Sequence, residues 1–406
     1  MEIKIIKGGV TAPGGFVAGG VHAGIRKNTS KKDLAVIYSP TVCDAAAVYT
    51  LNKVKGAPLT ITAKNLANGK AHAVLCNSGN ANTCNPDGEQ IADSMCGLLA
   101  KELKIASIDI IIASTGVIGK KLPLEPIAKA MPALCKGLAV GGADDAAEAI
   151  MTTDLTKKEI AVEFMLGGKL CKMGAIAKGS GMINPNMATM LCFVTTDAGI
   201  DSKLLHKALL EVTNQTFNLI CVDGDTSTND MVSVMANGAA GNAKITKPCA
   251  DYNTFKKALL AVCKTLAIKV AEDGEGATKL LTAIVAGAPT KEAAGKCAKA
   301  IISSSLVKSA FFGEDANWGR ILCAIGYSGA ECDVGRIEIW LGSADKKILV
   351  CKNGRGVEFD EDLAKLILKE KDIKIDVNMH QGSKSATAWG CDLTYDYVKI
   401  NGSYRS

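Results

Sequence analysis

The stretch GMINPNMATMLCFVTTD, residues 181–197, places a threonine where a turn runs into a buried strand. The segment NPN, with Pro185 at its centre, is a turn signal, and MLCFVTTD is an apolar run typical of a strand inside a protein. Thr189 therefore lies at the entrance of a central strand. A β-branched residue is favoured there by its backbone preference alone, so the position does not by itself require a chemical role.

A threonine at such a position can also be a nucleophile, provided that a base removes its hydroxyl proton. The chain has only 4 histidines among 406 residues. Another available base is the α-amino group of the threonine itself, which becomes free when the peptide bond before it is cut. An α-amine titrates at about 7.7 to 8.0, close enough to neutral pH to accept that proton. Thr189 is therefore a candidate nucleophile that needs no histidine.

Three glycine-rich segments follow or adjoin apolar runs: NSGNAN at 77–82, STGVIG at 114–119 and KGSG at 178–181. None of them matches the P-loop or the full dinucleotide-binding fingerprint. STGVIG reads as an ordinary turn at the end of a strand. It also reads as an oxyanion hole, in which Gly116 lets a backbone N–H approach a reacting carbonyl and the Thr115 hydroxyl is a second donor. The local sequence leaves both readings open.

Cysteine and histidine show no metal-binding pattern. The 15 cysteines are scattered from Cys43 to Cys391 without a C-x-x-C pair, and the closest two are Cys76 and Cys84. The histidines are not at ligand spacing from one another or from a cysteine. We therefore expect reduced, mostly buried thiols and no structural metal.

Composition narrows the class of protein. A length of 406 residues suits one large domain or two intertwined ones, and 48% hydrophobic residues provide an ample core. Aromatic residues are only 4%, and the net charge of +6 is spread without a basic tract, so nucleic acid is not the expected partner. The N-terminal segment lacks the pattern of a secretory signal, and no segment has the ~18 apolar residues needed for a membrane span. We expect a cytoplasmic protein.

Strand and helix patterns alternate along the chain. Residues 372–378 alternate apolar and polar side chains, which predicts a strand with one buried face, and GRIEIWLG at 335–342 and KKILVCKNG at 346–354 are similar. Residues 253–273 and 360–372 repeat apolar residues every three or four positions and predict helices. Strands followed by helices, with consecutive strands late in the chain, indicate a layered α+β fold. Composition marks no domain boundary.

Nine blocks of the sequence, taken together, resemble one family. In chain order they are GVTAPGGFVAGGVHAGIR, NSGNAN, STGVIG, AIMTTD, AKGSGMINPNMATML, DGDTSTND, DGEGATKL, GEDANWGR and YVKINGSYRS. They are similar to the ornithine acetyltransferase family, the glutamate N-acetyltransferases or arginine biosynthesis bifunctional proteins of the cyclic arginine pathway. The match runs from the first 30 residues to the last ten in consistent order.

The resemblance implies that the precursor cuts itself between Ala188 and Thr189. An α fragment, 1–188, and a β fragment, 189–406, would then share one intertwined fold. That fold would be a layered αββα sandwich, similar to the amine-activated N-terminal nucleophile hydrolases but with the connectivity of its own family. The two fragments would assemble as α2β2.

The resemblance also implies the reaction. Thr189 would take the acetyl group from N2-acetylornithine, hold it as an ester and pass it to the amine of glutamate in a ping-pong transfer. Thr115 and Gly116 would stabilise the oxyanion. No bound cofactor or metal is expected. Some members of the family also use acetyl-CoA as a donor, and no residue in this sequence decides whether this chain does.

The residues expected to bind substrate carry over one by one from the family's motifs: Thr152, Lys178, Thr189, Glu275, Asn401 and Ser406. Lys178 suits the α-carboxylate that ornithine and glutamate share, and Glu275 suits an ammonium group. Ser406 replaces the family's terminal threonine but keeps its hydroxyl. The acidic and polar blocks DGDTSTND and GEDANWGR are expected to be loop scaffolding, with the residues Asp223, Asp225, Glu314 and Asn317.

Two alternatives use the same residues differently. The first is a related aminopeptidase or amidase with an N-terminal threonine, in which water takes the acyl group. The second is an uncleaved amino-acid-binding protein that keeps the pocket without catalysis. The combination of Lys178, Ala188, Thr189 and the STG motif disfavours the second, because binding alone does not require a cleavable bond beside a nucleophile.

Overall fold

The structure is a computed structural model that describes residues 3–184 and 190–403. By its internal contacts the chain divides into two compact units. The first unit comprises Met1–Gly179, Asn186–Phe217 and Thr226–Leu266, and the second comprises Ser180–Pro185, Asn218–Asp225 and Ala267–Ser406. Each unit contains chain from both sides of position 189. The predicted fragments, 1–188 and 189–406, therefore both contribute to both units, while the cleavage itself stays a prediction.

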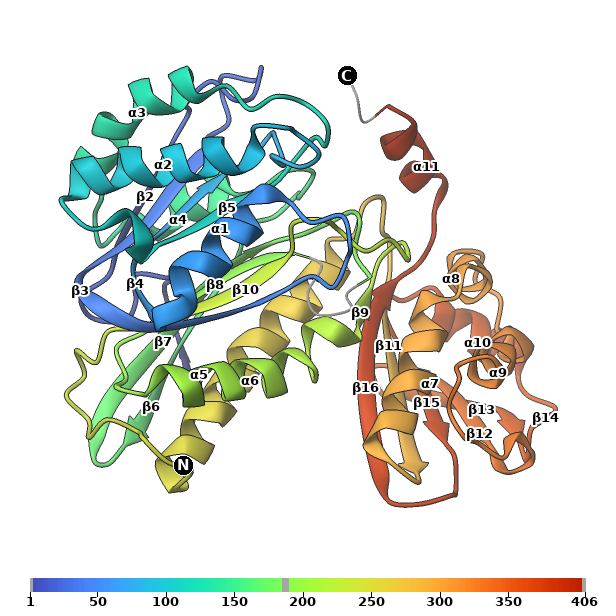
Figure 1. Cartoon of the computed structure of the whole chain (residues 1–406). Helices are drawn as coiled ribbons and strands as arrows, with labels where there is room; N and C mark the ends of the chain where they lie inside the picture. Colours follow the sequence, from blue (N-terminus) through green and yellow to red (C-terminus); the bar gives the residue numbers. More distant parts are fainter. Residues whose placement is uncertain (1–2, 185–189, 404–406) are drawn as a thin grey trace. The chain divides into compact units, whose positions relative to one another are not determined.

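The first unit is built on a nine-stranded sheet (Figure 1). Its strands are β1 (Lys4–Ile6), β2 (Val17–Val21), β3 (Leu34–Tyr49), β4 (Lys70–Asn77), β5 (Ile110–Ser114), β6 (Lys158–Leu166), β7 (Lys169–Lys178), β8 (Leu191–Thr196) and β10 (Met231–Ala236). The sheet order is β1-β6-β7-β8-β10-β3-β4-β5, with β2 paired to β3. Most neighbours are antiparallel, but β4 pairs with β5, and β8 with β10, in parallel.

Helices cover this sheet because its central strands have two apolar faces. Leu34 and Val36 of β3 belong to one hydrophobic cluster, whereas Ala35 and Ile37 belong to another, as the alternation along a strand requires. The helices of this unit are α1 (Ala57–Asn65), α2 (Gly88–Leu103), α3 (Leu124–Lys136), α4 (Ala143–Ala149), α5 (Ser202–Thr213) and most of α6 (Ala250–Glu272). Side chains of α2 and α3 fill the first cluster, and α4 contributes to the second.

The second unit has a seven-stranded sheet in the order β14-β13-β12-β15-β11-β16-β9. Its strands are β9 (Ile220–Cys221), β11 (Leu280–Ala288), β12 (Glu338–Ser343), β13 (Lys346–Lys352), β14 (Arg355–Gly356), β15 (Asp372–Asn378) and β16 (Lys384–Cys391). Its helices are α7 (Lys291–Ser303), α8 (Ser305–Phe312), α9 (Trp318–Gly326), α10 (Glu361–Leu368) and α11 (Tyr395–Gly402). Helices α7, α9 and α10 share one hydrophobic cluster with the strands.

The predicted elements are present where the patterns placed them. In β15 the residues Ile373, Ile375 and Val377 are buried, as the alternation predicted. The predicted helix at 253–273 is α6, and the apolar run after position 189 is β8, whose six residues are all buried. The α+β class is confirmed, with one mixed sheet in each unit.

Four short 3-10 turns complete the described elements: η1 (Leu66–Asn68), η2 (Ser107–Asp109), η3 (Phe217–Leu219) and η4 (Val334–Arg336). None of the helices within residues 3–184 and 190–403 combines the length and the apolar character of a membrane span.

Candidate functional site

Two of the glycine-rich motifs form a single loop cluster in the first unit. Strands β4 and β5 are parallel neighbours, and their last residues, Asn77 and Ser114, stand opposite each other. The motifs NSGNAN and STGVIG therefore leave the sheet side by side. The Thr115 N–H donates to the Asn77 carbonyl at 2.9 Å, and the Ser114 hydroxyl donates to the Asn77 side-chain oxygen at 2.6 Å. The predicted oxyanion residues thus lie on a loop that is hydrogen-bonded to its neighbour.

Gly116 lies where no side chain fits. Its φ is +133°, and a Cβ atom there would lie 2.4 Å from the carbonyl carbon of Gly79 and 2.5 Å from the nitrogen of Asn80. Both neighbours are backbone atoms, which cannot move aside cheaply. A glycine is therefore required for the two loops to approach each other.

Lys178 ends strand β7 and adds a positive charge to this cluster. Its Nζ donates to the Thr115 hydroxyl oxygen at 3.3 Å, and the residue is only 8% exposed. Within the part of the chain that the structure describes, no carboxylate pairs with this ammonium group. The carboxylate of Asp154 acts on this ammonium group electrostatically, and the further N–H donors of the ammonium group suit an anionic ligand.

The motif MTTD reaches the same cluster through Asp154. The Asp154 carboxylate accepts the Thr152 N–H at 2.9 Å and the Gly179 N–H at 2.7 Å, and it pairs with Lys158 at 2.8 Å. Burial opposes ionisation of Asp154, but the charges of Lys178 and Lys158 and these hydrogen bonds outweigh it and lower the pKa to about 2. Asp154 is therefore an anion at neutral pH.

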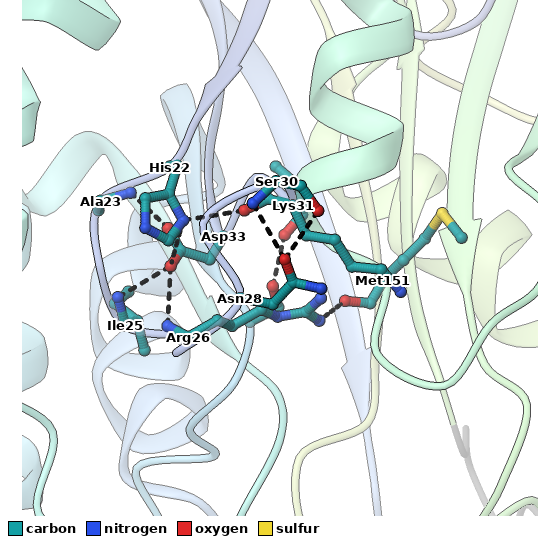
Figure 2. Close-up of polar contacts among 11 residues, drawn as sticks. His22, Ala23, Ile25, Arg26, Asn28, Ser30, Lys31, Asp33 and Met151 are labelled. Atoms are coloured by element: carbon teal, nitrogen blue, oxygen red, sulfur yellow. Dashed lines mark hydrogen bonds and ion pairs between the residues drawn. The ribbon is translucent and has the colours of Figure 1, made fainter.

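The N-terminal motif supports the turn before Thr152. Figure 2 shows the Asp33 carboxylate accepting the backbone N–H groups of Ala23, Ile25 and Arg26, at 2.5 to 2.9 Å. This arrangement shapes the loop so that the Arg26 guanidinium donates to the Met151 carbonyl. The block GGVHAGIR thus holds the backbone immediately before Thr152.

The remaining described site residues lie in the second unit. Asn401, on α11, donates from Nδ2 to the Glu275 carboxylate at 2.8 Å, and the Glu275 N–H donates to the Ser180 carbonyl at 3.0 Å. Gly181 is packed against Glu275, since a Cβ there would lie 2.3 Å from the carboxyl carbon. Glu275 and Asn401 are therefore direct neighbours. Ala188, Thr189 and Ser406 lie outside the described residues, so their predicted roles stay predictions.

One residue from each of the two acidic blocks holds backbone in the structure. Asp223 accepts the N–H groups of Met182 at 2.6 Å and Ile183 at 2.9 Å, within the second unit. Asn317 caps helix α9 by accepting the Arg320 N–H. Both side chains hold backbone, as expected for residues that shape loops.

Sequence reasoning did not single out Asn229, which lies in the block DGDTSTND two residues before β10 begins at Met231. Its amide donates to the carbonyls of Ala81 at 2.6 Å and Ser114 at 3.0 Å, and its oxygen accepts from the hydroxyls of Thr83 and Thr228. It therefore ties both loops of the cluster together. Nothing in the local sequence separates this asparagine from the other polar residues of its block.

The neighbouring Asp230 was not anticipated either. It is buried, and its Oδ2 has no hydrogen-bond partner among the described residues. Burial raises the pKa of this carboxyl well above its usual value, although a hydrogen bond from Ser227 and the charge of Lys178 act in the opposite direction. Burial therefore favours the protonated form of Asp230, and the Lys178 charge favours the ionised form.

No three His, Cys, Asp or Glu side chains gather in metal-binding geometry within residues 3–184 and 190–403. The expectation of a metal-free enzyme stays a prediction.

These features define a class. In the first unit an oxyanion-type loop lies beside a nearly buried ammonium group, and this arrangement suits an enzyme that acts on small substrates with a carboxylate. The comparisons with known proteins then identify the family within this class.

The ArgJ family model matches residues 17–406. The arginine biosynthesis bifunctional protein ArgJ of Caldanaerobacter subterraneus is 51% identical over 405 residues, covering 100% of both chains. The protein of the same name from Symbiobacterium thermophilum is 52% identical and covers 99% of each chain. A crystal structure of ArgJ from Bacillus halodurans is 53% identical with a TM-score of 0.50, covering 52% of this chain and 98% of that one. The chain belongs to the ArgJ family.

Proposed function

We propose that this chain transfers an acetyl group from N2-acetylornithine to glutamate, and that acetyl-CoA is a second acetyl donor. The observation that carries the proposal is the Lys178 ammonium group, nearly buried and hydrogen-bonded to Thr115 beside Gly116. It offers a cation for a substrate carboxylate next to donors for an oxyanion. Family membership supports the reaction, since the relatives are named bifunctional proteins of arginine biosynthesis.

The nucleophile in this proposal is Thr189, released by self-cleavage. Its hydroxyl oxygen attacks the carbonyl carbon of Ala188, the C–N bond breaks, and the acyl group moves from nitrogen to oxygen. Water then opens the ester, which leaves a carboxylate on Ala188 and a free α-amine on Thr189. The small side chain of Ala188 offers little obstruction to this attack.

The transfer then proceeds in two balanced half-reactions. The Thr189 amine accepts the hydroxyl proton while the oxygen attacks the acetyl carbonyl of N2-acetylornithine. The C–N bond breaks, the proton passes to the departing amine of ornithine, and acetyl-Thr189 remains. The neutral amine of glutamate attacks the carbonyl carbon of this ester, the C–O bond to Thr189 breaks, and a proton passes from the attacking amine through the Thr189 α-amine to the hydroxyl oxygen, so that N-acetylglutamate leaves and Thr189 is restored. Thr115 and Gly116 stabilise the oxyanion in both steps.

The substrate-binding residues divide the two charges of an amino acid between them. Lys178 attracts the α-carboxylate that ornithine and glutamate share, and Thr152 and the Ser406 hydroxyl add hydrogen bonds. Glu275, held by Asn401 at 2.8 Å, attracts the ammonium group of ornithine. The proposal includes an α2β2 assembly in the cytoplasm, with no resident cofactor or metal.

The lengths of related chains support the cleavage. The curated relative from Caldanaerobacter subterraneus aligns along the whole of this chain. The crystallised ArgJ chain from Bacillus halodurans aligns over 98% of its own length, but that alignment covers only 52% of this chain. A chain of about half length is what a cleaved precursor would contribute as one of its two fragments.

The first experiment is the denatured mass of the purified protein beside a Thr189→Ala variant. The proposal expects two fragments from the wild type, the second starting at Thr189, and a single 42.2 kDa chain from the variant. A wild type that stays intact would overturn the proposed mechanism and favour an amino-acid-binding protein.

A second experiment separates transfer from hydrolysis. Purified enzyme receives N2-acetylornithine with and without glutamate, and the products are quantified. Transfer predicts N-acetylglutamate in step with ornithine, whereas an amidase would release acetate that glutamate does not divert. Acetyl-CoA with glutamate, in the absence of ornithine derivatives, tests the second donor. Failure to form N-acetylglutamate there would restrict the enzyme to recycling acetyl groups.

A further inference from the structure

We propose that Asp154 is a positioning residue for substrate binding, which holds the turn with Thr152 against the end of strand β7 with Lys178. The inference rests on the proposed acetyl transfer, because Thr152 and Lys178 are its expected substrate ligands. Asp154 itself touches no substrate in this scheme. It acts through the backbone of the residues that do.

The contacts of Asp154 join two segments that are distant in the sequence. One carboxylate oxygen accepts the Thr152 N–H at 2.9 Å, and the other accepts the Gly179 N–H at 2.7 Å. Gly179 directly follows Lys178, so a single side chain sets the backbone position of both expected ligands. The Asp154 side chain is completely buried, which removes competing water from these bonds.

Asp154 also interacts electrostatically with two lysines, Lys178 and Lys158, whose charges favour its ionised form. The Lys158 ammonium group, completely buried, lies 2.8 Å from Asp154 and is neutralised by it. Lys178 donates to the Thr115 hydroxyl instead and has no paired carboxylate among the residues described. Lys178 thus lies in the field of the Asp154 anion while its printed hydrogen bond goes to Thr115, and the further donors of its ammonium group suit the carboxylate of a substrate.

The other end of the same turn is held independently. The Arg26 guanidinium donates to the Met151 carbonyl (Figure 2), and the Ser78 hydroxyl donates to the Ala149 carbonyl at 2.6 Å. Loss of Asp154 would therefore release the Thr152 end of the turn while its beginning stays attached. The expected consequence is a displaced ligand rather than an unfolded unit.

The test compares Asp154→Asn with Lys158→Met in the full-length enzyme. Asp154→Asn keeps the volume but places an amide N–H₂ opposite either the Thr152 N–H or the Gly179 N–H, so one backbone bond is lost. We expect KM to rise about tenfold or more for both N2-acetylornithine and glutamate, since small displacements of positioning groups are costly. Lys158→Met removes the ion pair but keeps both backbone bonds. It should lower the melting temperature and leave both KM values within about twofold.

The pattern of results distinguishes positioning from simple stabilisation. If both variants lower the melting temperature and raise KM to a similar extent, Asp154 is only a structural residue and the inference is wrong. If Asp154→Asn does not fold, the double variant Asp154→Asn, Lys158→Met removes both buried charges, and its KM values must still be raised. If the wild-type enzyme transfers no acetyl group, the proposed function is wrong. If the wild-type enzyme is active but the folded variants keep their KM values, only the inference about Asp154 is wrong.

Discussion

Gly116 combines a backbone conformation and a surrounding that exclude every other residue. Its φ of +133° is unfavourable for a residue with a Cβ, and that Cβ would lie 2.4 Å from a backbone atom of Gly79. We expect Gly116→Ala to separate the two loops and to lower kcat for acetyl transfer by about 10² to 10³, the usual loss when an oxyanion donor is misplaced. Initial rates at saturating substrate measure this change.

The matched control is Gly119→Ala in the same loop. Gly119 also has a positive φ, +74°, but no atom lies within 4 Å of the added Cβ. This variant carries the backbone strain, about 1 to 2 kcal/mol, without the collision. Its kcat should stay within a few-fold of the wild type. Equal losses in both variants would show that backbone strain, and not the close approach of the loops, limits the reaction.

The lowered pKa of Asp154 leads us to expect that the free energy of unfolding depends on pH. Its folded pKa of about 2 is below the ordinary value of 3.8, despite burial, because of the Lys178 and Lys158 charges and its hydrogen bonds. A depressed acid pKa contributes stability that is fully present above about pH 4 and is lost as the pH falls through 2. The lost part is about 2 kcal/mol. Between pH 5 and pH 2 the free energy of unfolding should fall less steeply for Asp154→Asn than for the wild type. Parallel pH profiles of the two proteins would contradict this account.

At the scale of elements, Asn229 connects the segment just before β10 to the loop after β4 and to the last residue of β5. Its side chain donates to two buried carbonyls, those of Ala81 and Ser114, at 2.6 and 3.0 Å. Asn229→Ala leaves both carbonyls without this donor, and each such loss costs about 1 to 3 kcal/mol. We expect a decrease of about 3 kcal/mol in the free energy of unfolding of the first unit, measured by urea denaturation.

Asn237→Ala is the control for this prediction. Asn237 donates to the Gly14 carbonyl at 2.9 Å and accepts the Ala239 N–H, but these bonds are exposed to water. Water can replace them, so the loss should be about 1 kcal/mol or less. If Asn237→Ala destabilises the protein as much as Asn229→Ala, the connection between β10 and the loops has no special importance.

At the scale of the whole molecule, the 15 cysteines are free thiols, and ten of them are buried. Burial raises the pKa of Cys43, Cys76, Cys96 and Cys263 to about 12, which suppresses the reactive thiolate. Only Cys84, Cys249 and Cys323 are exposed. A thiol reagent should therefore label three cysteines rapidly in the native protein and all 15 after denaturation. Rapid labelling of many more would contradict the described packing, and a deficit after denaturation would reveal disulfides.

Local patterns were sufficient for the class of fold and for many of its elements. The alternation at 372–378 predicted β15, because one face of that strand is buried and the other is not. The motif blocks identified the family, and Lys178 is hydrogen-bonded to Thr115 in the structure, while the roles predicted for Thr115, Gly116 and Lys178 stay predictions. Such residues are recognisable because their chemistry constrains both their type and their immediate neighbours.

The sequence by itself determined the α+β class, the family and the set of candidate ligands, since these depend on periodicity and on local motifs. Only the tertiary structure decided that β4 and β5 are parallel neighbours, and hence that their loops share one cluster. It also decided that Asp154 pairs with Lys158 and accepts two backbone N–H groups, and that Asn229 donates a hydrogen bond to the Ser114 carbonyl. The physical reason is that a buried polar group takes its partner from whatever the fold brings within about 3 Å, and for Asn229 and Ser114 that partner is 115 residues away.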